Sequence, residues 1–203
     1  KRYITAVCCL LAAALTSLCA ISQARQQRLA EKLIRLHVVA NSDTREDQRV
    51  KLLVRDAVLE TANGLLRDAQ NPEAALQTGL PELERAANEK LASLASLGCE
   101  ETASVSLRRE LFPTREYETF RLPAGVYRTL RVSIGQAGGH NWWCVVFPAL
   151  CLPAAQEDFT EACRAAGLTQ QEISVLTEDT GEVELEFRTL EWLGKLKKML
   201  WDA

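Results

Sequence analysis

The period of the hydrophobic positions changes at Gly98, from the helical spacing of about 3.6 residues to the alternation of two residues in the segments that follow directly. Between residues 50 and 65 the apolar residues recur every three or four positions, which is the spacing of one helical face. That face carries Val50, Leu53, Val54, Ala57, Val58, Thr61 and Leu65, and the opposite face carries Asp47, Lys51, Arg55 and Glu60. The pattern predicts an amphipathic helix over about residues 44–67.

A second helical region follows the break at Asn71-Pro72. We expect a short helical turn that ends near Thr78. Pro81 suits the first turn of a separate helix, because a proline there loses no intrahelical hydrogen bond. The predicted buried stripe of that helix consists of Leu83, Ala87, Leu91, Leu94 and Ala95, and Gly98 is its natural C-terminal stop.

Several segments have the period of two that is typical of strands buried on one face. Residues 103–107 and 129–134 alternate in this way, and residues 36–40 form a short apolar strand. Residues 142–147 are apolar throughout. A strand that is apolar on both faces belongs in the interior of a sheet, so this segment is predicted to be a central strand.

The last fifty residues carry weaker patterns. A helix is predicted over residues 158–166, a hairpin from residues 173–176 and 183–187, and a final amphipathic helix over residues 190–200. Neither a repeat nor a low-complexity linker is visible. We therefore predict a single α+β domain over residues 25–203, with a mostly antiparallel sheet packed against helices.

The first 24 residues resemble a hydrophobic export segment. Lys1 and Arg2 precede an uncharged, mostly apolar stretch from Ile4 to Ile21, and Ser22-Gln23-Ala24 suits a cleavage site. The stretch is long for a signal peptide and just long enough to span a bilayer. Residues 1–24 are thus a cleaved signal peptide or an uncleaved anchor, and both alternatives place the following domain outside the membrane.

The net charge limits the possible partners of the protein, and the cysteines bear on its compartment. The formal net charge of −3 and the absence of long basic runs argue against nucleic acid, and a membrane is expected to contact only the N-terminal segment. Four cysteines follow that segment, namely Cys99, Cys144, Cys151 and Cys163. Four cysteines in an exported domain allow three disulfide pairings. The sequence lacks a Cys-x-x-Cys pair, which gives little support to a thioredoxin site or a zinc ribbon.

Residues 135–151, GQAGGHNWWCVVFPALC, are the most unusual stretch. The glycine spacing matches no phosphate loop, and a strand rather than a helix follows, so the glycines are interpreted as a wide hairpin loop. The chain has only two histidines, His37 and His140, and neither belongs to a local sequence pattern of metal ligands. No cofactor or metal is predicted. The adjacent tryptophans Trp142 and Trp143 point to opposite faces of a strand. In one interpretation both side chains lie in the core, and in the other one of them contacts a partner.

An enzyme is the alternative that the residue types leave open. Cys144 or Cys151 is a candidate nucleophile of a secreted cysteine-dependent hydrolase, with a histidine as base. Against this, Cys144 lies among apolar residues, where a buried thiol or a disulfide is the simpler interpretation. The acidic residues Glu182, Glu184 and Glu186 are interpreted as an exposed strand face.

The segment Asn41-Ser42-Asp43 is interpreted as a structural turn between the first strand and the long helix. Its side chains are expected to satisfy the free N–H groups at the start of that helix. Asp43 with Glu46 three residues later resembles a capping box.

Two stretches resemble the stage II sporulation protein R family of endospore-forming bacteria. The first is IRLHVVANSDTREDQRVKLLVRDAV at residues 34–58, which carries the Ala-Asn-Ser-Asp turn and the Lys-x-x-Val-Arg-Asp-Ala-Val helix of that family. The second is PAGVYRTLRVSIGQAGGHNWWCVVFPALC at residues 123–151, with its Asn-Trp-Trp-Cys strand. Ala149 replaces a proline of the family pattern.

The resemblance implies a signalling protein without catalytic residues. Such proteins are made in the forespore and secreted into the space between the forespore and mother-cell membranes. There they activate a membrane-embedded aspartic-type protease that processes a mother-cell sigma factor precursor. On this interpretation the candidate partner-binding residues are His140, Asn141, Trp142 and Trp143.

A disulfide between Cys144 and Cys151 is also predicted. Pro148 cannot donate to a sheet ladder, so the strand should end there and the chain should turn. Such a turn brings Cys151 back beside Cys144, and an exported protein permits the bond. The alternative is two buried thiols, with Cys99 and Cys163 also free.

Overall fold

The computed structural model describes residues 2–95, 100–117, 119–150 and 159–177. The chain divides into two compact units, which we describe separately. The first consists of Lys1–Lys32, Leu111–Val126 and Leu168–Ala203, and the second of Leu33–Glu110 and Tyr127–Gly167. Helices and a β-sheet are both present, and both contribute residues to the core, which confirms the α+β class.

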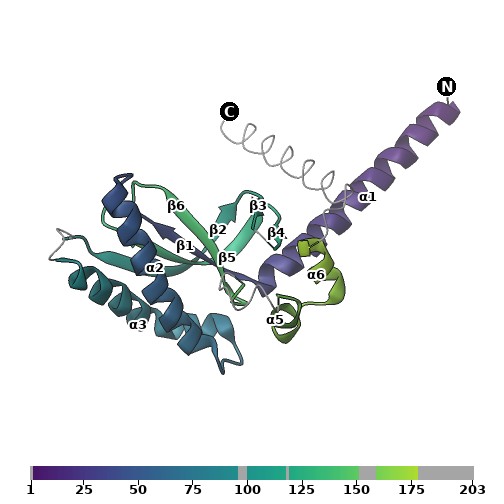
Figure 1. The fold of residues 1–203 in the computed structure, drawn as a ribbon. Coiled ribbons are helices and arrows are strands. Elements are labelled where there is room, and N and C mark those ends of the chain that lie inside the picture. The colour runs from purple at the N-terminus through teal and green to yellow at the C-terminus, as the bar shows by residue number, and fades with distance from the viewer. Residues whose placement is uncertain (1, 96–99, 118, 151–158, 178–203) are drawn as a thin grey trace. The chain divides into compact units, whose positions relative to one another are not determined.

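In the second unit, two long helices cover one face of a four-stranded sheet (Figure 1). They are α2 (Arg45–Leu66) and α3 (Pro72–Ser93), which pack side by side. Leu36 and Val38 of the sheet, Val54 and Val58 of α2, and Leu83 of α3 all belong to the core between these layers. The predicted helix over residues 44–67 is confirmed to within a residue at each end.

The sheet has the strand order β2-β5-β1-β6. Its members are β2 (Ala103–Phe112), β5 (Gly125–Ile134), β1 (Ile34–Val39) and β6 (Asn141–Phe147). Strand β1 pairs parallel with β5 and antiparallel with β6. All six residues of β1 are buried, as expected of a strand flanked on both sides.

The predictions for the strand over residues 142–147 and for the glycine loop were wrong. In the described sheet β6 is an edge strand, and β1 takes the interior place that the apolar run of β6 suggested. Because β1 lies between β5 and β6, residues 135–140 do not close a hairpin. They cross the end of β1 instead.

Helix α3 is continuous through Pro81, where we had predicted a new helix. Its buried residues Leu76, Gly79, Leu83, Ala87 and Leu91 form one stripe against α2 on both sides of the proline. The packing of that stripe outweighs the loss of the hydrogen bond that the Pro81 nitrogen cannot donate. Asn71 is the N-cap, since its side chain accepts a hydrogen bond from the Ala74 N–H.

The second unit also contains α5 (Phe159–Ala165), which lies within the predicted helix over residues 158–166. Its apolar contacts come from Phe159 and Cys163, both of which are buried. This part of the weaker C-terminal prediction is therefore confirmed.

The first unit contains α1 (Arg2–Lys32), the short antiparallel pair β3 (Arg115–Glu116) and β4 (Arg121–Leu122), and α6 (Gln170–Thr177). Helix α6 contradicts the predicted strand at residues 173–176. Ile173 and Leu176 are three positions apart, and both are buried on one face of the helix. Thr169 and Glu172 exchange reciprocal hydrogen bonds at its start, which is the capping box that the sequence analysis overlooked.

Several predictions concern residues outside the described part of the chain. These are the C-terminal stop at Gly98, the strand over 183–187 with its glutamates, and the helix over 190–200. Among the residues that the structure describes, no helix has the length and apolar character to cross a membrane. The export segment and the boundary between residues 24 and 25 stay predictions.

Candidate functional site

Two loops of the second unit pack against each other beside the start of β6. One loop belongs to the first sequence motif, at residues 34–58, and the other belongs to the second, at residues 123–151. We name this region the loop junction and define it as residues 40–44 and 135–140. The Gly138 N–H donates to the Asn41 carbonyl at 3.0 Å, and the Gly139 N–H donates to the Ala40 carbonyl at 3.0 Å. Backbone bonds thus tie the crossing loop to the end of β1.

Two glycines are required for this close approach. A Cβ atom on Gly139 would lie 2.2 Å from the Ser42 carbonyl oxygen, and one on Gly135 would lie 2.3 Å from Asn41 Oδ1. Gly135 also has a φ of +55°, which side chains strongly disfavour. Gly139 thus allows backbone contact between the two motifs, and Gly135 provides a positive φ beside the Asn41 side chain. Neither glycine belongs to the hairpin that the sequence suggested.

The polar residues of the turn hold the loop junction and do not cap helix α2 directly. Asn41 Oδ1 accepts from the Gln136 N–H at 2.9 Å, and Asp43 Oδ1 accepts from the His140 N–H at 2.6 Å. The His140 Nδ1 atom also contacts Asp43 Oδ1. The N-cap is Thr44, whose side chain accepts from the Asp47 N–H. The predicted capping box of Asp43 was therefore wrong, although residues 41–43 do form the strand-to-helix turn.

Lys51 connects helix α2 to the loop junction. Its ammonium group donates to the His140 carbonyl at 2.9 Å and to Gln48 Oε1 at 2.5 Å. Burial lowers the pKa of Lys51, and the nearby Asp43 carboxylate opposes that shift. The helical pattern had assigned Lys51 to the polar face opposite the core, but only 5% of it is exposed. Its long side chain reaches the loop from that face.

Trp142 is a partly exposed aromatic residue next to the loop junction. It is 38% exposed, and the Arg55 guanidinium lies 4.4 Å from its ring centroid in a cation–π contact. Arg55 also pairs with Asp56 at 2.7 Å. The interpretation that both tryptophans lie in the core is therefore wrong for Trp142. His140 and Asn141, its neighbours in sequence, are exposed as well.

Trp143 faces the other side of the sheet, where a row of polar side chains crosses the strands. The Trp143 ring lies 5.9 Å from the His37 ring. His37 Nδ1 contacts Glu110 Oε2 at 2.6 Å, and His37 Nε2 lies 2.9 Å from Asn141 Oδ1. Arg131 donates to Glu110 Oε1 at 3.3 Å. One residue from each of the four strands thus contributes to the row.

Glu110 is the charge at the centre of this row. Its burial raises the carboxyl pKa, but the hydrogen bonds from His37 and Arg108 lower it more, so the pKa of Glu110 lies below its usual value. The Arg108 Nε donates to Glu110 Oε1 at 2.6 Å. A carboxylate that three basic partners hold ionised is unsuited to accept a proton near neutral pH. We therefore interpret the row as a structural ion-pair network and not as a site of acid–base catalysis.

The cysteines argue against the hydrolase alternative. Cys144 is buried and disulfide-bonded, so it has no thiolate to act as a nucleophile. Cys163 is free, and burial raises the pKa of its thiol to about 11. Cys151 lies outside the described residues, and its predicted bond with Cys144 stays a prediction. Within the described ranges, His, Cys, Asp and Glu side chains form no group of three that would hold a metal ion.

Two comparisons with known proteins found a related family. The family model described as stage II sporulation protein R matches residues 30–157, which include both loops of the junction. The chain is also similar to the stage II sporulation protein R of Bacillus subtilis (strain 168), with 35% identity over 126 residues. That match covers 61% of this chain and 55% of the relative, so the chain spans about half the relative's length. No solved structure matches it significantly.

The family match covers well over half of the chain, and it contains every residue of the loop junction, β1, α2 and β6. The loop junction thus lies within the part of the chain that the family model matches. On this evidence the chain belongs to the stage II sporulation protein R family.

Proposed function

We propose that this protein is an exported sporulation signal that activates a membrane-embedded aspartic-type protease. In this proposal the chain is made in the forespore and exported into the space between the forespore and mother-cell membranes. The protease then processes a mother-cell sigma factor precursor. Family membership supports the sporulation role, and the N-terminal apolar stretch supports export.

The observation that carries the proposal is the Trp142–Arg55 pair beside the loop junction, in which Trp142 is exposed and Arg55 is partly buried. Tryptophan and arginine are the residues most often found as energetic anchors of protein interfaces. Here they are stacked and held by α2 and β6, so little side-chain entropy remains to be lost on binding. The pair lies within the family-matched residues, as does the loop junction.

A triggering ligand must bind the active form of its receptor more tightly than the inactive form. A rigid surface meets that requirement better than a mobile one, because it selects among receptor conformations. The loop junction supplies the rigidity through backbone hydrogen bonds and the Lys51 bridge. We therefore assign Trp142, Arg55 and the exposed residues His140 and Asn141 to the receptor-contacting surface.

The test is reconstitution of triggering. Purified protein of residues 25–203 is added to membranes that carry the protease and the sigma factor precursor, and precursor cleavage is measured. Trp142→Ala should weaken triggering about 30-fold, as expected for loss of an interface anchor worth ~2 kcal/mol. Leu111→Ala is the matched control, since Leu111 is an exposed apolar strand residue of the first unit.

Three results would separate this proposal from others. Cleavage by the protein in the absence of the protease would support the enzyme alternative. A folded Trp142→Ala protein with unchanged triggering would remove the proposed surface. His140→Ala should keep part of the activity, because His140 is proposed as a contact and not as a catalytic base.

A further inference from the structure

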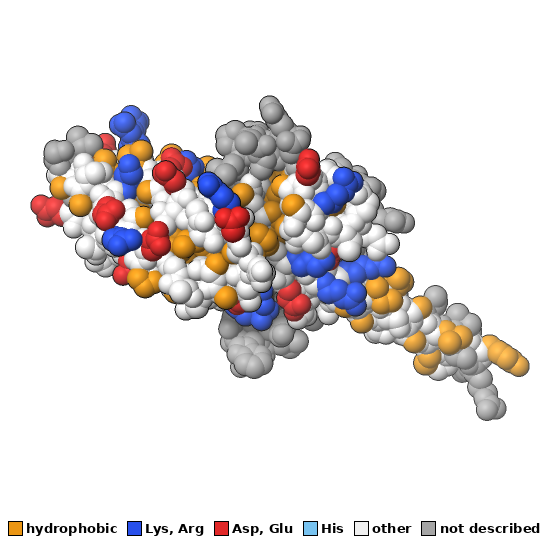
Figure 2. Space-filling view, turned by 90° about the horizontal axis from the view of Figure 1, so that it is seen from below, with side chains coloured by type: hydrophobic (Ala, Val, Ile, Leu, Met, Phe, Trp, Pro, Cys, Tyr) orange, Lys and Arg blue, Asp and Glu red, His pale blue; other side chains and the backbone are white. Residues whose placement is uncertain are grey.

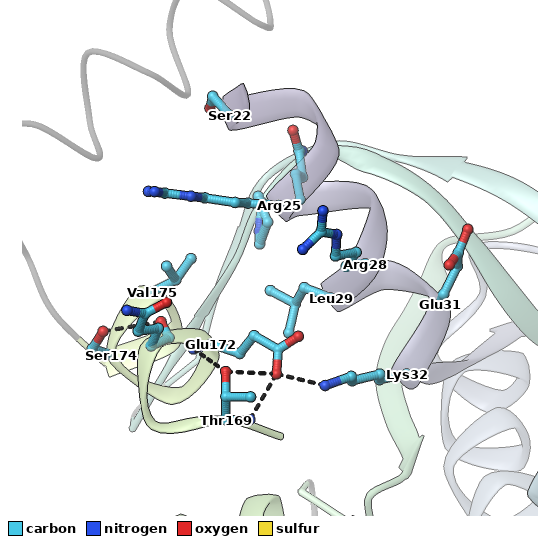
Figure 3. Close-up of a pocket in the computed structure, with 13 residues that line it drawn as sticks. Ser22, Arg25, Arg28, Leu29, Glu31, Lys32, Thr169, Glu172, Ser174 and Val175 are labelled. Atoms are coloured by element: carbon cyan, nitrogen blue, oxygen red, sulfur yellow. Dashed lines mark hydrogen bonds and ion pairs between the residues drawn. The ribbon is translucent and has the colours of Figure 1, made fainter. Parts of the chain in front are cut away.

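The first unit contains a basic groove between α1 and α6 that the proposed function does not use (Figure 3). The groove encloses about 810 Å³. Its α1 wall carries Arg25, Arg28 and Lys32, and its α6 side carries Glu172 and its neighbours. We propose that this groove binds the phosphate headgroups of anionic phospholipids.

The groove is lined by three basic side chains, Arg25, Arg28 and Lys32, but by only two carboxylates, Glu31 and Glu172. Lys32 pairs with Glu172 at 2.7 Å, and Glu172 also accepts from the Thr169 N–H at 2.7 Å. Among the described residues, Arg25 and Arg28 take part in no ion pair, and both are exposed. Figure 3 shows Arg25 reaching out on the groove side of α1. Glu31 also lines the groove, and its carboxylate accepts from Gln27 Nε2 at 3.3 Å. Two free guanidinium groups on one wall suit a phosphate, which they bind through paired N–H donors.

The apolar part of α1 continues on the same helical face into the basic residues. With about 100° of rotation per residue, Leu18, Ile21, Arg25 and Arg28 fall within an arc of about 80°. Tyr3 and Leu10 lie on the same arc, and all four apolar residues are exposed. Figure 2 shows basic side chains gathered beside the end of an apolar helical surface.

The spacing along the helix fits the layers of a bilayer. Arg25 and Arg28 lie about 6 and 10 Å along the axis from Ile21, because an α-helix rises 1.5 Å per residue. The headgroup layer on each side of the hydrocarbon core is about 5–8 Å thick. With the exposed apolar residues in the hydrocarbon, the two arginines reach the phosphates. A freely diffusing phosphate compound would have no use for the adjoining apolar stripe, so the lipid is the favoured source.

Vesicle binding of the full chain tests the proposal. The vesicles are phosphatidylcholine alone and an equimolar mixture with phosphatidylglycerol, and the bound fraction is measured by co-sedimentation. We expect tighter binding to the anionic vesicles. Because each basic residue near an anionic surface strengthens binding about fivefold, Arg25→Gln with Arg28→Gln should reduce that preference about 30-fold. High salt should reduce it as well, by screening.

Two further variants control for charge and folding. Arg49→Gln with Arg85→Gln removes the same charge from exposed positions of the second unit and should leave the preference unchanged. Arg25→Lys with Arg28→Lys keeps the charge and should retain most of the preference. Circular dichroism confirms that each variant is folded.

Equal loss of preference in both glutamine pairs would overturn the proposal, since bulk charge would then explain the binding. Equal binding to both vesicle types would overturn it too. The proposal would also be overturned if millimolar inorganic phosphate competed for the groove and the protein showed no preference between the vesicle types. The groove would then be a site for free phosphate. None of these outcomes bears on precursor cleavage, so this inference and the proposed function fail separately.

Discussion

Replacing Gly139 with alanine tests whether the two loops of the junction need direct backbone contact. The added Cβ would lie 2.2 Å from the Ser42 carbonyl oxygen and 2.5 Å from its carbonyl carbon. Nonbonded heavy atoms pack best about 3.5–4.0 Å apart, so the loops must separate by more than 1 Å. The obstacle is backbone, and a change of side-chain rotamer cannot relieve it.

The expected cost follows from what that separation breaks. Overpacking costs about 1–3 kcal/mol. The Gly139–Ala40 and Gly138–Asn41 hydrogen bonds are weakened, and each contributes about 0.5–1.5 kcal/mol. We expect a loss of about 3 kcal/mol in the free energy of unfolding, which lowers Tm by about 6–12 °C for a chain of this size.

Gly138→Ala is the matched control at the neighbouring position. Its Cβ would lie 3.4 Å from the Asn41 carbonyl oxygen, which is an ordinary contact. We expect a change below about 1 kcal/mol, of either sign. Urea and thermal unfolding followed by circular dichroism measure both variants. Equal stability of the two alanine proteins would refute the idea that the loop junction depends on backbone contact at Gly139.

Three other predictions concern the same unit. The pKa of Glu110 is lowered in the folded protein, so its contribution to stability is present above pH 4.5 and is lost as pH falls through the folded-state value. Glu110→Gln should therefore flatten the dependence of the unfolding free energy on pH in acid. Identical slopes for the two proteins would contradict this. Thr44→Ala should cost about 1 kcal/mol in urea unfolding, whereas Thr44→Ser should cost little, because a serine hydroxyl also caps the helix. Mass spectrometry of a non-reducing digest should find Cys144 linked to Cys151, and a link from Cys144 to any other cysteine would disprove that pairing.

Local patterns predicted the elements better than their arrangement. The helix over residues 45–66 follows from apolar spacing, which is a property of neighbouring residues. Alternation predicted residues 103–107 and 129–134 of the strands that span 103–112 and 125–134. The order of the strands does not follow from it, because Ile34 pairs with Arg128 and alternation says nothing about which strand is adjacent. For the same reason an apolar run alone placed residues 142–147 wrongly in the interior of the sheet.

The candidate site was predicted only as two separate stretches. The sequence identified Asn41 and Asp43 as a turn and His140 as part of a loop, but each interpretation stayed local. Their contacts join residues almost a hundred positions apart, as in the bond from the His140 N–H to Asp43. Lys51 was missed because helical periodicity records which face a residue is on, and not how far its side chain extends.

The position of β1 between two later strands sets the order in which the chain can fold during synthesis. Both ladders of β1 join residues about 100 positions apart, and contacts of that separation form slowly. At about 5–20 residues per second, the ribosome needs roughly 5–20 s to extend the chain from the end of β1 at Val39 to the end of β6 at Phe147. Helices α2 and α3 are adjacent in sequence and can pair during that interval, whereas β1 has neither neighbour. A nascent chain that ends before residue 125 therefore carries an apolar strand without its sheet, and it remains a substrate for chaperones until the second motif has emerged.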